Sequence, residues 1–136
     1  MARSLTLSRA QWQEMMAHVQ RELPNEACGL LGGQGGKVYR VYSVENVEHS
    51  PWEYRMDPME QVRVMLEIEA AGWELNGIFH SHPAGPPVPS TTDIARAYYP
   101  EVIYVIVAPK ADGAWRARGF QIEEGQVEEV ALEVAE

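Results

Sequence analysis

The chain has 136 residues, of which 46% are hydrophobic and 23% are charged, which is typical of one globular domain with its own core. Twenty acidic and eleven basic residues give a formal net charge of −9, which argues against nucleic acid as a partner because phosphates are bound by clustered Lys and Arg. The longest strongly apolar run, residues 102–108, is too short to cross a membrane, so we expect a single cytoplasmic domain over residues 1–136.

The first predicted element is a helix that begins after Ser8. Ser8 and Gln11 have the spacing of a capping box, and Pro24 ends the helical pattern. The apolar residues that recur at helical spacing are Trp12, Met15, Val19 and Leu23. Residues 27–33 and 37–44 then predict the two strands of a hairpin, because the glycines between them supply the positive φ that tight turns need.

A second helix is predicted from Pro58, with Asp57 as its N-cap and Gly72 after its end. The apolar stripe expected to face the core is Met59, Val62, Leu66 and Ala70.

The second half of the chain predicts four strands and a short helix. One strand is expected at about residues 74–82, and a third helix from Ser90 to Tyr99, closed by Pro100. Residues 102–108 are apolar on both faces, as in a central buried strand, and two further strands are expected at residues 114–122 and 126–134. These elements predict an α/β (α+β) fold in which about three helices flank a mixed β-sheet.

Two histidines stand two positions apart at the end of the predicted strand over residues 74–82. Because side chains alternate along a strand, the imidazoles of His80 and His82 are expected to point to one side. Asp93 follows in the first turn of the predicted third helix, after a loop that four prolines restrict. Two neutral imidazoles and one carboxylate suit a divalent ion of borderline character and leave a fourth position for water. The spacing therefore predicts a metal site.

The same segment also has a purely structural interpretation. Ser90 and Asp93 have the spacing of a capping box that opens a helix. The two roles are compatible, because we expect the cap to use the serine oxygen and the backbone while one carboxylate oxygen stays free to face the histidines. His18 and His49 have no such neighbours, and we expect both on the surface.

The segment HSHPAGPPVPSTTD resembles the signature of the JAMM, or MPN-plus, metalloproteases, in which His-x-His-Pro is followed by Ser-x-x-Asp. That family also has a glutamate near the end of its first helix, and PNEACGLLGG supplies Glu26 in that context. The order of helices and strands is similar to the minimal JAMM fold over essentially the whole chain. The resemblance implies a cytidine-deaminase-like fold and the compact prokaryotic type of this family.

The resemblance also implies an activity, a zinc-dependent peptidase or isopeptidase. His80, His82 and Asp93 would be the Zn²⁺ ligands, as their residue types already suggest. Glu26 would act as general base, and Ser90 would donate its hydroxyl to the oxyanion of the tetrahedral intermediate.

The resemblance further implies a protein substrate. Some compact prokaryotic members act on small sulfur-carrier proteins of β-grasp fold that end in Gly-Gly, and release cysteine or another adduct from that end. We therefore expect as partner a ubiquitin-like or sulfur-carrier protein with a Gly-Gly C-terminus. Full deubiquitinase activity is not expected, because 136 residues leave little room for the insertions that grip ubiquitin.

Three alternatives stand beside this interpretation. The first is a cysteine protease that uses Cys28, the single cysteine, although free cysteines more often behave as small buried hydrophobic residues. The second is a zinc deaminase, whose paired-cysteine pattern is absent. The third is a non-catalytic MPN scaffold or binding module.

Four aromatic residues lie near the motif in sequence: Trp52, Tyr54, Tyr98 and Tyr99. Aromatic side chains are more often part of a core than of a site, so we expect core packing here, with a substrate cleft as the alternative.

Overall fold

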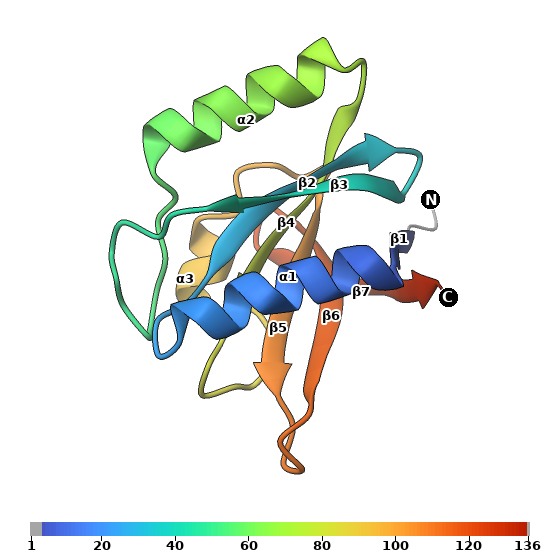
Figure 1. Ribbon diagram of the computed structural model, residues 1–136. Coiled ribbons are helices and arrows are strands. Elements are labelled where there is room, and N and C mark those ends of the chain that lie inside the picture. The colour runs from blue at the N-terminus through green and yellow to red at the C-terminus, as the bar shows by residue number, and fades with distance from the viewer. Residues whose placement is uncertain (1–3, 136) are drawn as a thin grey trace.

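The computed structural model describes residues 4–135, in which seven strands form one sheet that closes into a barrel and three helices pack against it (Figure 1). The strands are β1 (Ser4–Ser8), β2 (Cys28–Gln34), β3 (Lys37–Val44), β4 (Glu74–Ser81), β5 (Ile103–Pro109), β6 (Trp115–Glu123) and β7 (Gln126–Ala135). The helices are α1 (Arg9–Glu22), α2 (Pro58–Ala70) and α3 (Thr91–Ala95).

The sheet is mixed, as the sequence predicted. Its strand order is β1-β3-β2-β4-β5-β6-β7, and β4 lies between antiparallel β2 and parallel β5. Closure was not predicted, because it depends on β1, which pairs in parallel with β7 and also contacts β3. The capping box at Ser8 correctly marks the start of α1, but β1 has only five residues and its main partner, β7, lies at the other end of the chain, so the strand was not predicted.

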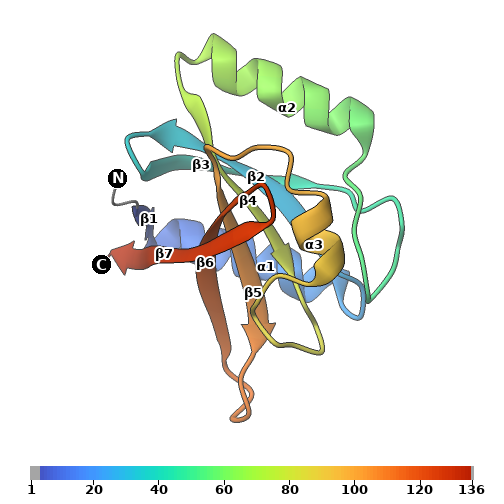
Figure 2. The ribbon, with the colours of Figure 1, turned by 180° about the vertical axis from the view of Figure 1, so that it is seen from behind.

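Helices cover the sheet from two sides. Figure 1 shows α1 in front of the strands, and Figure 2, from behind, shows α3 on the opposite side. Met15 and Val19 of α1 are fully buried, as predicted, and Met15 packs in one core cluster with Leu5 and Phe79. Leu23 is exposed because α1 ends at Glu22. Helices α2 and α3 pack at the second core cluster.

The face of α2 that meets the sheet differs from the prediction. Val64 and Ile68 are buried, whereas Met59, Val62 and Leu66 are 79%, 55% and 59% exposed. Apolar residues occur at helical spacing on two faces of α2, so the period alone does not identify the buried face. The predicted stripe was therefore wrong.

Helix α3 is shorter than the predicted span of Ser90 to Tyr99. It ends at Ala95, and the backbone N–H of Tyr99 donates to the hydroxyl of Tyr104 at 3.1 Å. A helix continuing to Tyr99 would need that N–H for a carbonyl four residues earlier. The hydrogen bond from Tyr99 to Tyr104 of β5 thus takes the place of a helical hydrogen bond. The predicted strands on either side of α3 are confirmed to within one or two residues.

None of the described helices is long and apolar enough to cross a membrane. The cytoplasmic location and the single domain over residues 1–136 stay predictions.

Gly29 allows β2 to pack closely against the strand that carries His80. It pairs with Phe79 of β4, and a Cβ at this position would overlap the Phe79 ring and the carbonyl oxygen of Tyr42. We expect Gly29→Ala to lower the free energy of unfolding by about 3 kcal/mol, measured by urea denaturation. Gly35→Ala is the control, since Gly35 has open space and only a positive φ of 58°, and should cost about 1 kcal/mol. Equal losses for the two variants would contradict the close-packing explanation.

Candidate metal centre

The end of β4 and the start of α3 bring three polar side chains to one point. His80 lies on β4 and is almost fully buried, and His82 follows the end of that strand. The Nε2 atoms of the two histidines are 3.0 Å apart. The Oδ2 atom of Asp93 lies 3.2 Å from Nε2 of His80 and 3.1 Å from Nε2 of His82. The three residues grouped by sequence spacing therefore meet in space.

Asp93 is positioned by the cap of α3. The Ser90 hydroxyl accepts a hydrogen bond from the Asp93 N–H at 3.0 Å, and the Ser90 N–H donates to Oδ2 of Asp93 at 2.9 Å. This reciprocal capping box confirms the structural role of both residues. We expected one carboxylate oxygen of Asp93 to stay free of the cap and face the histidines. This expectation was wrong, because the same atom, Oδ2, both accepts the Ser90 N–H of the cap and contacts the histidines.

The loop after His82 fixes the tautomer of that residue. Nδ1 of His82 lies 2.8 Å from the carbonyl oxygen of Pro86, and the Gly85 N–H donates to the His82 carbonyl oxygen. Since a carbonyl oxygen only accepts, Nδ1 carries a hydrogen, so in the neutral form of His82 the lone pair is on Nε2, the nitrogen that faces His80 and Asp93. The proline-rich loop thus fixes the orientation of the His82 ring.

The electrostatics of the cluster favour an anionic Asp93. Burial would raise the pKa of Asp93, but hydrogen bonds from His80 and His82 hold it well below its usual value. Burial lowers the pKa of His80, which favours its neutral form. Burial also opposes a charge on His82, but hydrogen bonds to Asp93 and Pro86 outweigh this effect and raise its pKa.

The geometry and the donor set fit a zinc ion. An ion bonded at about 2.0–2.1 Å in tetrahedral geometry separates its ligand atoms by about 3.3–3.4 Å. The three distances among His80 Nε2, His82 Nε2 and Asp93 Oδ2 are 3.0, 3.1 and 3.2 Å. Two imidazole nitrogens and one carboxylate oxygen are also the ligand types that zinc accepts when a fourth position stays open.

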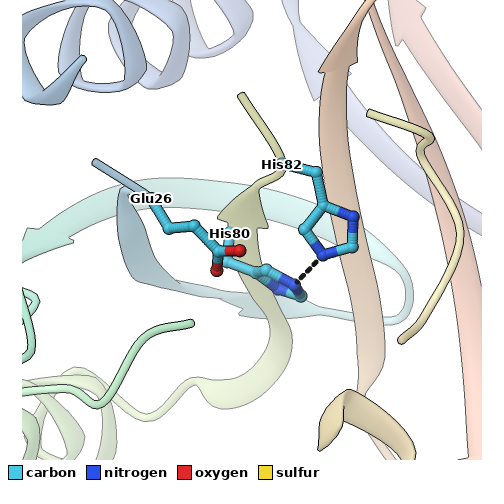
Figure 3. A group of neighbouring side chains, drawn as sticks. All are labelled: Glu26, His80 and His82. Atoms are coloured by element: carbon cyan, nitrogen blue, oxygen red, sulfur yellow. Dashed lines mark hydrogen bonds between the residues drawn. The ribbon is translucent and has the colours of Figure 1, made fainter. Parts of the chain in front are cut away.

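Glu26 completes the group from the segment before β2. Its carboxylate points towards the two imidazoles (Figure 3), and the three side chains offer ligand atoms that all lie within 4.8 Å of one another. Burial raises the pKa of Glu26 to about 8, and its Oε1 atom has no hydrogen-bond partner among the described residues. Glu26 is thus a possible ligand by chemistry, but the Oδ2 atom of Asp93 is closer to both nitrogens. This arrangement favours Asp93 as ligand and Glu26 as a neighbour.

Asn46 holds the backbone around Glu26, and sequence reasoning missed it. Its buried Nδ2 donates to the carbonyl oxygens of Glu26 at 3.0 Å and Glu53 at 3.2 Å. Its Oδ1 accepts from the N–H groups of Glu48 and Arg55, each at 3.0 Å. One asparagine in a polar segment carries no sequence signal of this role, because only the folded loop creates its partners.

His18 is buried, so the prediction of a surface position was wrong. It follows Met15 at helical spacing on the inner face of α1, where its Nε2 lies 3.1 Å from the carbonyl oxygen of Cys28 and its ring meets Phe79 edge-on. His49 is exposed, as predicted.

Cys28 is fully buried on β2. Its thiol donates to the carbonyl oxygen of Val44 at 3.6 Å, and burial raises its pKa strongly. A buried, neutral thiol cannot attack a substrate carbonyl, so the cysteine-protease alternative lacks an accessible nucleophile.

A cleft of about 480 Å³ adjoins Asp93. All four aromatic residues singled out from the sequence line it: Trp52, Tyr54, Tyr98 and Tyr99. Trp52 and Tyr98 are 76% and 73% exposed, which contradicts the expectation of core packing for these two. Tyr54 and Tyr99 also pack partly against the core, so both interpretations hold for them. A larger hollow of about 990 Å³ between α2 and the beginning of β4 includes none of the residues of the His80 cluster.

Comparison with known proteins gives a consistent assignment. The family model described as prokaryotic homologs of the JAB domain matches residues 8–118. The CysO-cysteine peptidase of Mycobacterium tuberculosis is 37% identical over 124 residues, which covers 90% of this chain and 85% of that protein. The probable TtuB-protein conjugate cleaving protease of Thermus thermophilus is 40% identical over 131 residues, covering 96% and 82%. A solution structure of a Desulfitobacterium hafniense protein has a TM-score of 0.85 at 39% identity, covering 97% and 94%.

Removal of the Asn46 amide should destabilise the fold strongly. Asn46→Ala leaves backbone groups of Glu26, Glu53 and Arg55 without their partner, so we expect a loss of about 3 kcal/mol in the free energy of unfolding. The control is Ser50→Ala, which removes one hydrogen bond to the Trp52 N–H at an exposed site and should cost less than about 1 kcal/mol. Urea denaturation of both variants measures the difference. A loss at Asn46 no larger than at Ser50 would refute the role of Asn46.

Proposed function

Because the chain belongs to the prokaryotic JAB-domain family, we propose that it is a zinc-dependent JAMM peptidase or isopeptidase. Its substrate would be a ubiquitin-like or sulfur-carrier protein, cleaved at the amide bond after the C-terminal Gly-Gly tail with release of cysteine or another adduct. The observation that carries the proposal is the convergence of His80, His82 and Asp93 beside the buried Glu26.

The proposed ligands of the zinc ion are Nε2 of His80, Nε2 of His82 and the carboxylate of Asp93. Zinc held there would lower the pKa of a bound water molecule to about 7 and polarise the substrate carbonyl. The protein contributes the preset tautomer of His82 and the capped, anionic Asp93, so these two ligands need little rearrangement.

Glu26 is the proposed general base. Burial raises the pKa of Glu26 to about 8 in the chain without metal, and a cation held beside it would lower that pKa towards the working pH, where a carboxylate can both accept and donate a proton. Its Oε1, which has no hydrogen-bond partner among residues 4–135, is available to accept a proton from water and to pass it to the leaving amine. Asn46 keeps the backbone of Glu26 in place during this exchange.

Ser90 is the proposed donor to the oxyanion of the tetrahedral intermediate. Its oxygen accepts the N–H of Asp93, which leaves the hydroxyl hydrogen free for another acceptor. Ser90 is exposed and immediately precedes α3, so a substrate carbonyl can approach it. Capping and donation therefore use different parts of the same hydroxyl.

The proposed substrate rests on the relatives. Two of them are named for cleaving CysO-cysteine or TtuB conjugates, and this chain matches more than four fifths of each. The aromatic cleft beside Asp93 is the proposed path for the extended tail. A non-catalytic scaffold is less consistent with the chain, because the residue types of the signature are intact.

Zinc content tests the metal centre. We expect purified wild type to bind about one zinc ion per chain, and Asp93→Ala to lose it, because two imidazoles alone bind the ion weakly. Elemental analysis after gel filtration measures the content, with circular dichroism to establish that both proteins are folded. The centre is rejected if zinc-supplied wild type stays metal-free.

The roles of Glu26 and Ser90 are tested with a β-grasp carrier that ends in Gly-Gly followed by one cysteine. Glu26→Gln should keep zinc but slow the release of cysteine by about 10²-fold or more, because the amide cannot accept the proton. Ser90→Ala should also keep zinc and lower kcat by about 10²-fold. Mass spectrometry of the carrier follows the reaction. If Ser90 is only a cap, its variant will show a lower Tm while the folded fraction keeps wild-type kcat.

A further inference from the structure

The two histidines of the candidate metal centre are supported differently. A metal-ligating imidazole usually donates its second N–H to a carboxylate, a carbonyl oxygen or water, which fixes the orientation of the ring. His82 follows this rule through Pro86. His80 does not, because its buried Nδ1 has no hydrogen-bond partner in the described part of the chain. Another contact must hold the His80 ring.

That contact is the ring of Tyr54. The Tyr54 and His80 rings are stacked, with centroids 4.5 Å apart and an interplanar angle of 28°. The His82 ring meets His80 edge-on, with centroids 4.8 Å apart and an angle of 64°. A face contact and an edge contact together restrict rotation of the imidazole about χ2, which is otherwise a broad torsion.

The backbone of Tyr54 is itself tightly held. Asn46 binds the residues on both sides of it, through the carbonyl oxygen of Glu53 and the N–H of Arg55. Arg96, just after α3, donates to the Tyr54 carbonyl oxygen at 3.3 Å and pairs with Glu53 at 3.5 Å. The Tyr54 ring is therefore presented to His80 from a backbone fixed by two neighbouring segments.

We propose that Tyr54 is a positioning residue of the metal centre, whose ring replaces the missing hydrogen bond at Nδ1 and keeps Nε2 of His80 directed at His82 and Asp93. The inference rests on the proposed function, because it assumes that these three residues bind a metal ion. Tyr54 also lines the cleft beside Asp93, so its ring separates the face of His80 from that cleft. Loss of the ring would let the imidazole rotate away from the ligand orientation.

The test is the zinc affinity of the folded protein, measured by competition with a chromophoric chelator. Tyr54→Phe keeps the ring and should bind zinc within about twofold of wild type. Tyr54→Leu removes the ring and should bind about 10-fold more weakly or worse, the usual size of a supporting-shell loss. If the leucine variant does not fold, Tyr54→Met replaces it in the test, because methionine also lacks the ring but fills more of the volume that the tyrosine occupies. Tyr98→Leu is the matched control, since Tyr98 lines the same cleft without a ring contact to His80 in the described structure.

A second readout separates positioning from stability. The visible spectrum of the Co²⁺-substituted protein reports ligand geometry and should be wild-type in Tyr54→Phe and altered in Tyr54→Leu or Tyr54→Met. Zinc affinity and Co²⁺ spectrum equal to wild type in the ringless variants, whatever their Tm, would overturn the inference and leave the proposed function standing. Absence of zinc binding by wild type would instead overturn the metal centre itself.

Discussion

One carboxylate oxygen joins the elements on which the candidate site depends. Oδ2 of Asp93 accepts from the Ser90 N–H at the start of α3 and lies within 3.2 Å of Nε2 of both His80 and His82. The helix cap and the cluster of His80, His82 and Asp93 therefore share an atom, and this oxygen connects the start of α3 to the end of β4. The hydrogen bond between Nδ1 of His82 and the Pro86 carbonyl oxygen fixes the orientation of the His82 ring.

The opposite wall of the site is built from the segment between β3 and α2. Asn46 ties this segment to the backbone of Glu26, and the same segment carries Tyr54 over the His80 ring. Of the three buried side-chain atoms without hydrogen-bond partners in the described structure, two lie here, Oε1 of Glu26 and Nδ1 of His80, and the third is Oδ1 of Asn76. Buried polar atoms without partners destabilise a fold, so their concentration at one point is typical of a site organised for chemistry rather than for stability.

The sequence predicted most of the framework but not the second wall. His80, His82 and Asp93 were found because strand alternation and the capping spacing of Ser90 each have a short-range physical basis. Asn46 was missed because its four hydrogen-bond partners come from separate parts of the folded loop and from the segment before β2. The buried face of α2 was misassigned since that helix is apolar on two sides, and barrel closure was missed because β1 is only five residues long and pairs with β7, which is distant in sequence. Short-range sequence patterns therefore predicted which side chains meet at the site, whereas the residues that support them depend on long-range packing.

The most direct test of the account is a crystal structure of the zinc-loaded protein with anomalous scattering recorded at the zinc edge. The account predicts one peak at bonding distance, about 2.0–2.2 Å, from Nε2 of His80, Nε2 of His82 and the Asp93 carboxylate. Glu26 should lie outside bonding distance and face the fourth position. A peak bonded to Glu26 in place of Asp93, or located away from the two histidines, would contradict the account.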